Sequence, residues 1–286
     1  MSKRKKNIST NSIPSSLLKF ISILQKVSTK LTVKFASKLF GSPIKYKIPK
    51  REFHMEKKSK QELLYIPKIK KQIMIYQYGE NSKKVLLVHG WSGRGTQLVK
   101  IADKLIELGY STISFDAPAH GKSPSKKTLM PEFIESILEL DRKFGPFEYA
   151  IGHSLGSMSI LNAIKDGLKV QKAIIIGSGD SVNDILKDFV SKLGLKPIIA
   201  EKMRDSFEKK HAIDMESFSS NIVARKINIP TLIIHDKNDT DVPYTASKNI
   251  HLHLKNSKLI LTEDLGHRKI LGDEKVIQEI ESFLSN

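Results

Sequence analysis

From about residue 61 onward, short apolar runs alternate with longer amphipathic segments. Runs that are apolar at successive positions are typical of strands buried on both faces of a sheet. Eight such runs predict strands, over residues 63–66, 73–78, 85–88, 112–115, 148–151, 173–176, 231–234 and 258–261. In the segments between them, apolar side chains recur at helical spacing. These segments predict helices over about 96–108, 129–143, 155–166, 245–254 and 274–284.

Alternation of this kind predicts the α/β class, with a mostly parallel central sheet flanked by helices. The short turn at 68–71 predicts that the first two strands pair antiparallel. Residues 178–228 interrupt the alternation, since they contain two helical patterns, at about 181–193 and 197–210, and no comparable strand run.

An N-terminal segment, residues 15–40, has the pattern of a basic amphipathic helix. Ile23 and Val33 break the pattern, and Gly41 ends the helix. The apolar side chains that share one stripe are Leu17, Phe20, Ile21, Leu24, Val27, Leu31, Phe35 and Leu39. The lysines that lie outside it are Lys19, Lys26, Lys30 and Lys34. The stripe could pack on the main body of the protein, lie on an anionic membrane, or contact another partner.

Composition narrows the classes of function. The 286 residues carry a formal charge of +18, of which +16 belongs to residues 1–72, so the remainder is nearly neutral. A basic surface confined to one appendage does not predict a nucleic-acid-binding protein. The chain has no Cys, which excludes disulfides and thiolate sites. Without a secretory-signal pattern or an apolar run of about 18 residues, a cytoplasmic protein is expected, with membrane-peripheral attachment as the alternative.

The segment Gly152-His153-Ser154-Leu155-Gly156 follows a predicted strand and opens a predicted helix. A G-x-S-x-G motif in that context predicts a tight strand-to-helix turn that exposes Ser154 as a nucleophile. The helix N-terminus would then direct free N–H groups at the reacting centre.

Further along the chain, Asp239-Thr240-Asp241-Val242-Pro243 follows the strand at 231–234, and Gly266-His267 follows the strand at 258–261. These segments and the G-x-S-x-G motif resemble the α/β-hydrolase family in order and position, over about residues 61–286. The resemblance implies an α/β-hydrolase fold with a catalytic triad of Ser154, Asp239 and His267. Asp236 remains a second candidate for the acid.

Two more segments carry the resemblance. His89-Gly90-Trp91 follows the strand at 85–88, as the family's oxyanion loop does, and residues 115–123 are similar to the family's D-x-P-G-H-G-x-S segment, with Ala119 in place of a Gly. By this resemblance, the backbone N–H groups of Trp91 and Leu155 form the oxyanion hole. Asp116 and His120 are expected to fix their loop, and His153 to support the turn.

The expected organisation is a basic extension over 1–60 and an α/β-hydrolase domain over 61–286, with a short helical cap at 178–228. The resemblance implies a serine hydrolase of the esterase branch, which cleaves a small or medium acyl ester through an acyl-enzyme. The same triad could serve an amidase, peptidase or thioesterase, and a membrane- or partner-binding protein with little turnover is the alternative of another class. No cofactor and no metal is expected, and the oligomeric state stays open.

Overall fold

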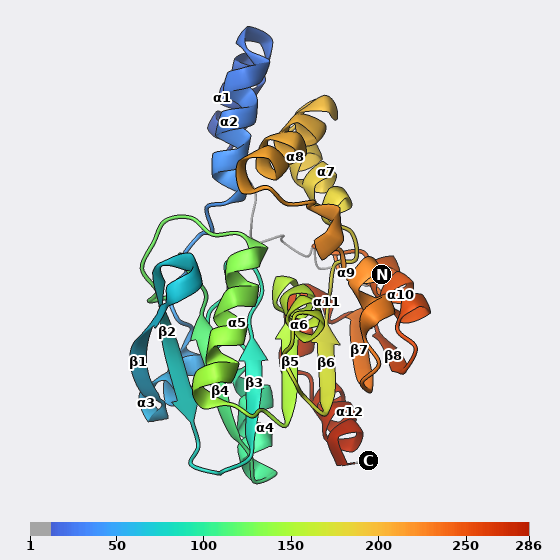
Figure 1. The fold of residues 1–286 in the computed structure, drawn as a ribbon. Coiled ribbons are helices and arrows are strands. Elements are labelled where there is room, and N and C mark those ends of the chain that lie inside the picture. The colour runs from blue at the N-terminus through green and yellow to red at the C-terminus, as the bar shows by residue number, and fades with distance from the viewer. Residues whose placement is uncertain (1–12, 286) are drawn as a thin grey trace, which may run out of the picture. The chain divides into compact units, whose positions relative to one another are not determined.

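A computed structural model describes residues 13–285. Contacts divide the chain into two compact units, one of residues Met1–Lys38 and Asn183–Ile213 and one of residues Leu39–Val182 and Asp214–Asn286. The described part of the first is mainly helical, and the second contains the whole sheet (Figure 1). Among the described residues, no helix combines the length and the apolar character that crossing a membrane requires.

The sheet has eight strands in the order β1-β2-β4-β3-β5-β6-β7-β8. Their bounds are β1 Lys60–Ile66, β2 Lys71–Tyr78, β3 Lys84–Val88, β4 Ser111–Asp116, β5 Tyr149–His153, β6 Lys172–Ile176, β7 Thr231–Asp236 and β8 Ser257–Thr262. β2 pairs antiparallel with both β1 and β4, and all other pairs are parallel. Each predicted strand and the predicted antiparallel hairpin are therefore confirmed.

Helices cover both faces of this sheet (Figure 1). Their bounds are α3 Phe53–Lys58, α4 Val99–Glu107, α5 Met130–Phe144, α6 Leu155–Lys165, α9 Ser220–Val223, α10 Thr245–His253, α11 Gly266–Lys269 and α12 Glu274–Ser285. The helices predicted at 96–108, 129–143, 155–166, 245–254 and 274–284 correspond to α4, α5, α6, α10 and α12. The short helices α3, α9 and α11 have too few turns to produce a readable periodicity.

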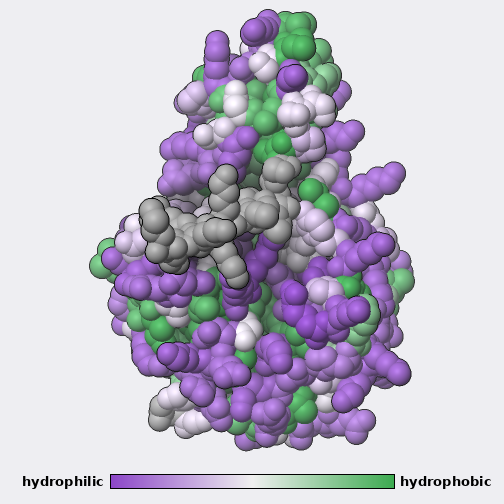
Figure 2. Space-filling view, turned by 180° about the vertical axis from the view of Figure 1, so that it is seen from behind, coloured by the Kyte–Doolittle hydropathy of each residue, from purple (hydrophilic) through white to green (hydrophobic). Residues whose placement is uncertain are grey.

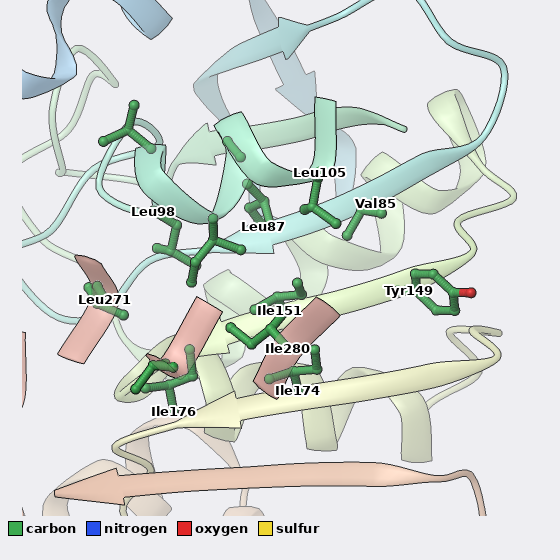
Figure 3. Packing of buried hydrophobic residues seen from close by; sticks show 14 of the residues in the cluster. Val85, Leu87, Leu98, Leu105, Tyr149, Ile151, Ile174, Ile176, Leu271 and Ile280 are labelled. Carbon is green, nitrogen blue, oxygen red and sulfur yellow. The ribbon is translucent and has the colours of Figure 1, made fainter. Parts of the chain in front are cut away.

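Alternation along the strands explains the two-sided core. Ile174 and Ile176 of β6 face α4 and α12 together with Leu87 and Ile151, as Figure 3 shows, whereas Ile175 packs against α6 and α10 on the opposite face. Because both faces of β6 are buried, successive residues must all be apolar, which is the pattern that the sequence displays.

The helical unit contains α1 Ser15–Val27, most of α2 Thr29–Phe40, most of α7 Val182–Lys192 and α8 Ile198–His211. The single helix predicted over 15–40 is wrong, because Ser28 is extended (φ −157°) and separates α1 from α2. The rings of Phe20 and Phe35 lie 5.3 Å apart. In one straight helix they would be about 22 Å apart, so the two helices fold back on each other.

Ser28 caps the start of α2, but the helical periodicity of the sequence continues through it and does not reveal the break. The Ser28 hydroxyl accepts a hydrogen bond from the Leu31 N–H at 3.3 Å, which is the arrangement of a helix N-cap. Within the same unit, the Gln25 side chain accepts a hydrogen bond from the Lys196 N–H at 2.7 Å. Contacts thus group the described part of the N-terminal helices with the two inserted helices, and the apolar stripe is divided between buried and exposed positions.

The unit that contains the sheet begins at Leu39, before residue 61, where the sequence predicts the start of the α/β-hydrolase domain. Met55 of α3 is fully buried in the core cluster of the sheet, and Glu52 is fully buried as well. The predicted division assigns a function to each part: an extension over 1–60, a hydrolase domain over 61–286 and a cap over 178–228. Contacts alone do not test those functions, so the division stays a prediction.

We expect Ile151→Ala to lower the free energy of unfolding by about 3 kcal/mol, because the truncation leaves a cavity at the centre of the sheet. Urea unfolding measures the effect. Leu252→Ala is the matched control, since Leu252 is highly exposed and its truncation should change stability by less than about 0.5 kcal/mol. Equal effects of the two substitutions would contradict the core described here.

Candidate active site

Ser154 occupies the turn between β5 and α6 with a strained backbone. Its φ of 53° and ψ of −119° lie outside the regions that an L-residue prefers, which costs about 1–3 kcal/mol. The Ser154 N–H is anchored by the Ile176 carbonyl at 2.8 Å. The sharp elbow that the G-x-S-x-G motif predicts is therefore present, with Ser154 directly before the first residue of α6.

The two glycines of the motif allow this helix to lie against the sheet. A Cβ on Gly156 would collide with the Val88 carbonyl oxygen, and a Cβ on Gly152 would come within 2.7 Å of the Gly156 backbone. A larger residue at Gly156 would push α6 away from β3, and one at Gly152 would push α6 away from β5; either change would open the turn.

The loop after β3, which contains Gly90 and Trp91, approaches the same turn. A Cβ on Gly90 would lie 2.9 Å from Cβ of Ser154, so the loop passes immediately beside the serine. The Ser92 N–H is bonded to Nε2 of His120 and the Gly93 N–H to the Gly90 carbonyl. By contrast, the Trp91 and Leu155 N–H groups have no hydrogen-bond acceptor anywhere in the stretch 13–285.

His267 and Asp239 are in direct contact. Nδ1 of His267 lies 2.6 Å from Oδ2 of Asp239. The other carboxylate oxygen accepts the N–H groups of Asp241 and Val242 at 2.8 and 2.9 Å. Burial would raise the pKa of Asp239, but hydrogen bonds from His235 and His267, the charge of His267 and the Val242 N–H outweigh it and hold that pKa well below its ordinary value. Asp239 is therefore an ionised carboxylate that is held in place by backbone N–H groups and is hydrogen-bonded to the His267 imidazole.

The second candidate acid, Asp236, does not contact His267. Its carboxylate accepts hydrogen bonds from the Thr262 hydroxyl at 2.7 Å and from the N–H groups of Asn238 and Leu265 at 2.9 and 3.0 Å. Asp236 thus ties the loop after β7 to the loop after β8, which is the loop that carries His267.

His235 is a site residue that the sequence analysis does not single out. It is fully buried, and its Nε2 lies 3.2 Å from Oδ2 of Asp239 and 3.1 Å from the Val242 carbonyl. Since the carbonyl can only accept, Nε2 carries the proton, and Nδ1 accepts from the Ser247 hydroxyl at 2.6 Å. The sequence feature that could have identified His235 is its position as a polar residue near the end of an otherwise apolar strand.

His153 connects the turn at Ser154 to the segment that carries His267. Its Nε2 donates to the His267 carbonyl at 2.8 Å, and the two rings have centroids 4.6 Å apart. Burial, followed by the charge of His267, lowers the pKa of His153 well below its ordinary value, so this ring is neutral. Ser154 is the next residue in the chain. The structure therefore brings Ser154, Asp239 and His267 to the same edge of the sheet, and Gly177 after β6 lies against the His–Asp pair.

Two neutral histidines join the loop after β3 to the loop after β4. Nε2 of His89 accepts the Ala117 N–H at 3.0 Å, and Nδ1 donates to the Gly90 carbonyl at 2.7 Å. Nε2 of His120 accepts the Ser92 N–H at 3.0 Å, and Nδ1 donates to the Pro118 carbonyl at 3.1 Å. Burial lowers the pKa of His89 to about 4 and that of His120 to about 3.

Asp116 secures the same two loops. It is buried and accepts hydrogen bonds from the N–H groups of Gly95 and Lys122 at 2.6 and 2.7 Å and from the Tyr76 hydroxyl at 2.9 Å. Burial raises the pKa of Asp116, although these hydrogen bonds oppose the rise. Ala119, which replaces a glycine of the family pattern, adopts a φ of 67° that glycine would adopt without strain.

A buried ion pair holds the far end of the loop after β3. The fully buried carboxylate of Glu52 accepts hydrogen bonds from Nε and Nη2 of Arg94 at 2.7 and 3.0 Å and from the Thr96 hydroxyl at 2.7 Å. The loop that carries Trp91 is thus fixed from both sides. Throughout the described range, 13–285, no cluster of three or more His, Asp or Glu side chains is arranged to hold a metal ion.

The buried histidines predict a loss of stability in mild acid. Because the pKa values of His89 and His120 lie below the ordinary 6.5, the unfolded chain takes up protons below that pH that the folded protein does not. Stability is complete above pH 6.5 and falls towards about pH 4. At about pH 5, each such histidine should cost roughly 2 kcal/mol relative to neutral pH.

His120→Asn should reduce that pH dependence, although the variant is less stable at neutral pH because it loses ring contacts. Urea unfolding at neutral pH and at about pH 5 measures both quantities. His211→Asn is the control, since His211 is exposed and should leave the pH dependence unchanged. An unaltered acid sensitivity in His120→Asn would contradict the neutral, buried ring.

Two family models match parts of this chain. The family model described as alpha/beta hydrolase fold matches residues 83–223, and the model described as TAP-like protein matches residues 211–286. No curated protein matches the chain.

Solved structures resemble the chain at low sequence identity. A bromoperoxidase from Bacillus anthracis is 20% identical with a TM-score of 0.61, over 79% of this chain and 100% of that one. An esterase from Exiguobacterium antarcticum is 19% identical with a TM-score of 0.63, over the same shares. A bacterial membrane phospholipase A is 15% identical with a TM-score of 0.63, over 94% of this chain and 96% of that one. These structures and the sheet order show the α/β-hydrolase fold. The two family models together span residues 83–286, and on that basis the chain belongs to the α/β-hydrolase family.

Proposed function

We propose that this protein is a serine hydrolase that cleaves a carboxylic ester of a small or medium acyl substrate. The contact between His267 Nδ1 and Asp239 Oδ2, at 2.6 Å, carries the proposal. It orients the imidazole so that its other nitrogen, Nε2, remains for a proton from Ser154. The strained elbow supports the same assignment, since it exposes a hydroxyl that an ordinary turn would leave unconstrained.

The proposed reaction has two stages. Ser154 Oγ attacks the ester carbonyl carbon while His267 Nε2 takes the hydroxyl proton, and the electron pair of the carbonyl moves onto its oxygen. On collapse of the tetrahedral species, the bond to the alcohol breaks and His267 returns the proton to the leaving oxygen. Water then attacks the acyl-enzyme by the same proton transfers, which releases the acid and restores the Ser154 hydroxyl.

The proposed reaction creates two charged species, the oxyanion of the tetrahedral intermediate and the His267 imidazolium, and the site offers groups that stabilise each. The Trp91 and Leu155 N–H groups are the proposed oxyanion donors. Leu155 follows Ser154 in the chain, Trp91 follows Gly90, which lies against Ser154, and neither N–H has another acceptor in the described chain. A single donor of this kind typically contributes about 3 kcal/mol to transition-state stabilisation. Asp239 stabilises the imidazolium, and His235 positions Asp239 from its other side.

The esterase from Exiguobacterium antarcticum and the membrane phospholipase A both bear names that refer to ester cleavage, which favours esters among the bonds that such a triad can break. Amide and thioester substrates use the same proton transfers, so a panel of substrates is needed to identify the bond that is cleaved.

A fluorophosphonate probe should label the wild-type protein at Ser154, because the probe reacts with an activated serine hydroxyl, and should not label Ser154→Ala. Ser159→Ala is the matched control: Ser159 lies on the same helix with its hydroxyl bonded to the Leu155 carbonyl, and its loss should preserve labelling. Labelling is followed by gel fluorescence and peptide mapping. Labelling of Ser154→Ala, or none in folded wild type, would refute the nucleophile.

The chemical bond is tested on p-nitrophenyl esters of increasing chain length, beside aminoacyl amides and thioesters. Turnover of short and medium esters that disappears in Ser154→Ala supports the proposal. Preferential turnover of amides or thioesters by a labelled protein would retain the triad and replace the substrate class.

Asp239→Asn should lower kcat by about 10³- to 10⁴-fold, because an amide cannot hold the required tautomer of His267. Asp241→Asn in the same loop is exposed and should stay near wild type. Steady-state kinetics on the best ester, with circular dichroism as a check of folding, measures the difference. If Asp236→Asn were the more damaging substitution in a folded protein, the acid would be assigned wrongly.

A further inference from the structure

The helical unit exposes large apolar side chains that its own packing leaves uncovered. Phe20, Ile23 and Val27 of α1 are 50%, 63% and 74% exposed, and Leu31 of α2 is 51% exposed. Burying four such side chains stabilises any complex that covers them by several kcal/mol. In Figure 2, hydrophobic and hydrophilic side chains are intermixed on the surface of this unit.

Three of these four residues share one face of α1. At 100° per residue, Phe20, Ile23 and Val27 fall within about 60° of one another on α1. Leu31 follows on the first turn of α2, just past the break at Ser28. We call this set, Phe20, Ile23, Val27 and Leu31, the hairpin apolar face.

Lysines flank the hairpin apolar face and no acid accompanies them. Lys19 and Lys26 lie about 40–60° from Ile23 on α1, while Lys30 and Lys34 lie next to Leu31 and one turn after it on α2. Residues 13–38 contain five Lys and neither Asp nor Glu. The first carboxylate of the chain is Glu52, which belongs to the sheet unit and is bound to Arg94. Positive charge on this face therefore has no counter-charge in its own helices.

We propose that the hairpin apolar face binds the surface of an anionic phospholipid bilayer. A bilayer offers what both parts of the face require, since the acyl boundary accepts Ile23, Val27 and Leu31 while lipid phosphates accept the lysines. The composition favours lipid over nucleic acid. Residues 13–38 contain no Arg, the residue best suited to phosphate and base recognition, and three of the four exposed side chains are aliphatic and cannot stack on bases.

The direct measurement is co-sedimentation of the full-length protein with two kinds of vesicle. The expected result is binding to vesicles rich in phosphatidylglycerol, weak binding to vesicles of phosphatidylcholine alone, and a large loss of binding at about 0.5 M salt, where the Debye length falls to a few ångströms. Equal binding to the two vesicle types, or none to either, would overturn the proposal.

Paired variants locate the surface. Lys26→Gln with Lys30→Gln should weaken partitioning about 30-fold, at the energy per lysine that anionic membranes provide. Lys209→Gln with Lys210→Gln removes the same charge from exposed positions on α8 and should change partitioning far less.

For the apolar part, Ile23→Ser with Val27→Ser should weaken binding at least tenfold, because two bulky aliphatic side chains no longer enter the acyl boundary. Leu252→Ser is the control for exposed apolar surface elsewhere. Melting temperature and fluorophosphonate labelling check each variant, and both should stay near wild type. Undiminished vesicle binding in the hairpin variants, or binding of DNA that vesicles fail to compete, would refute the assignment, whether or not the hydrolase activity is confirmed.

Discussion

The close approach of α6 to β3 is the constraint on which the rest of the sheet unit depends. Gly156 lies so near the Val88 carbonyl that no side chain fits between them, and this contact holds the start of the helix at the edge of the sheet. Because the strand before it is fixed by its pairing with β3 and β6, the chain has one residue in which to reverse, and Ser154 adopts a φ of 53° as a result. The strain at Ser154 is thus a consequence of helix–sheet packing.

Around this turn, the loops at the carboxyl edge are held mainly by hydrogen bonds between backbone groups and buried side chains. His89 and His120 act as neutral connectors, each accepting one N–H and donating to one carbonyl. Charge is reserved for a few places, where Asp239 meets two histidines and Glu52 meets Arg94. A site built this way needs little reorganisation when negative charge develops beside it, since its dipoles are already oriented.

The sequence predicts the sheet and the sharp turn at Ser154 well, because both depend on patterns that are local. A buried parallel strand must be apolar at consecutive positions, and the elbow needs glycines two residues either side of Ser154. What escapes prediction is set by contacts between distant segments. His235 is an isolated polar residue in an apolar strand until Asp239 folds against it, and Ser28 reads as one more helical position until its hydroxyl caps α2. The division of the apolar stripe into covered and exposed halves likewise depends on how α1 and α2 fold back.

The buried carboxylate of Glu52 limits how far the N-terminus can be shortened before the hydrolase unit itself is injured. A deletion that stops before residue 39 removes helices of the other unit only. One that continues through residue 60 takes away the partner of a guanidinium that is only 11% exposed, and an unpaired buried charge of this kind costs about 3–5 kcal/mol. Arg94 lies three residues from Trp91, so inactivity in so short a chain would reflect a displaced loop and would say little about the lost helices.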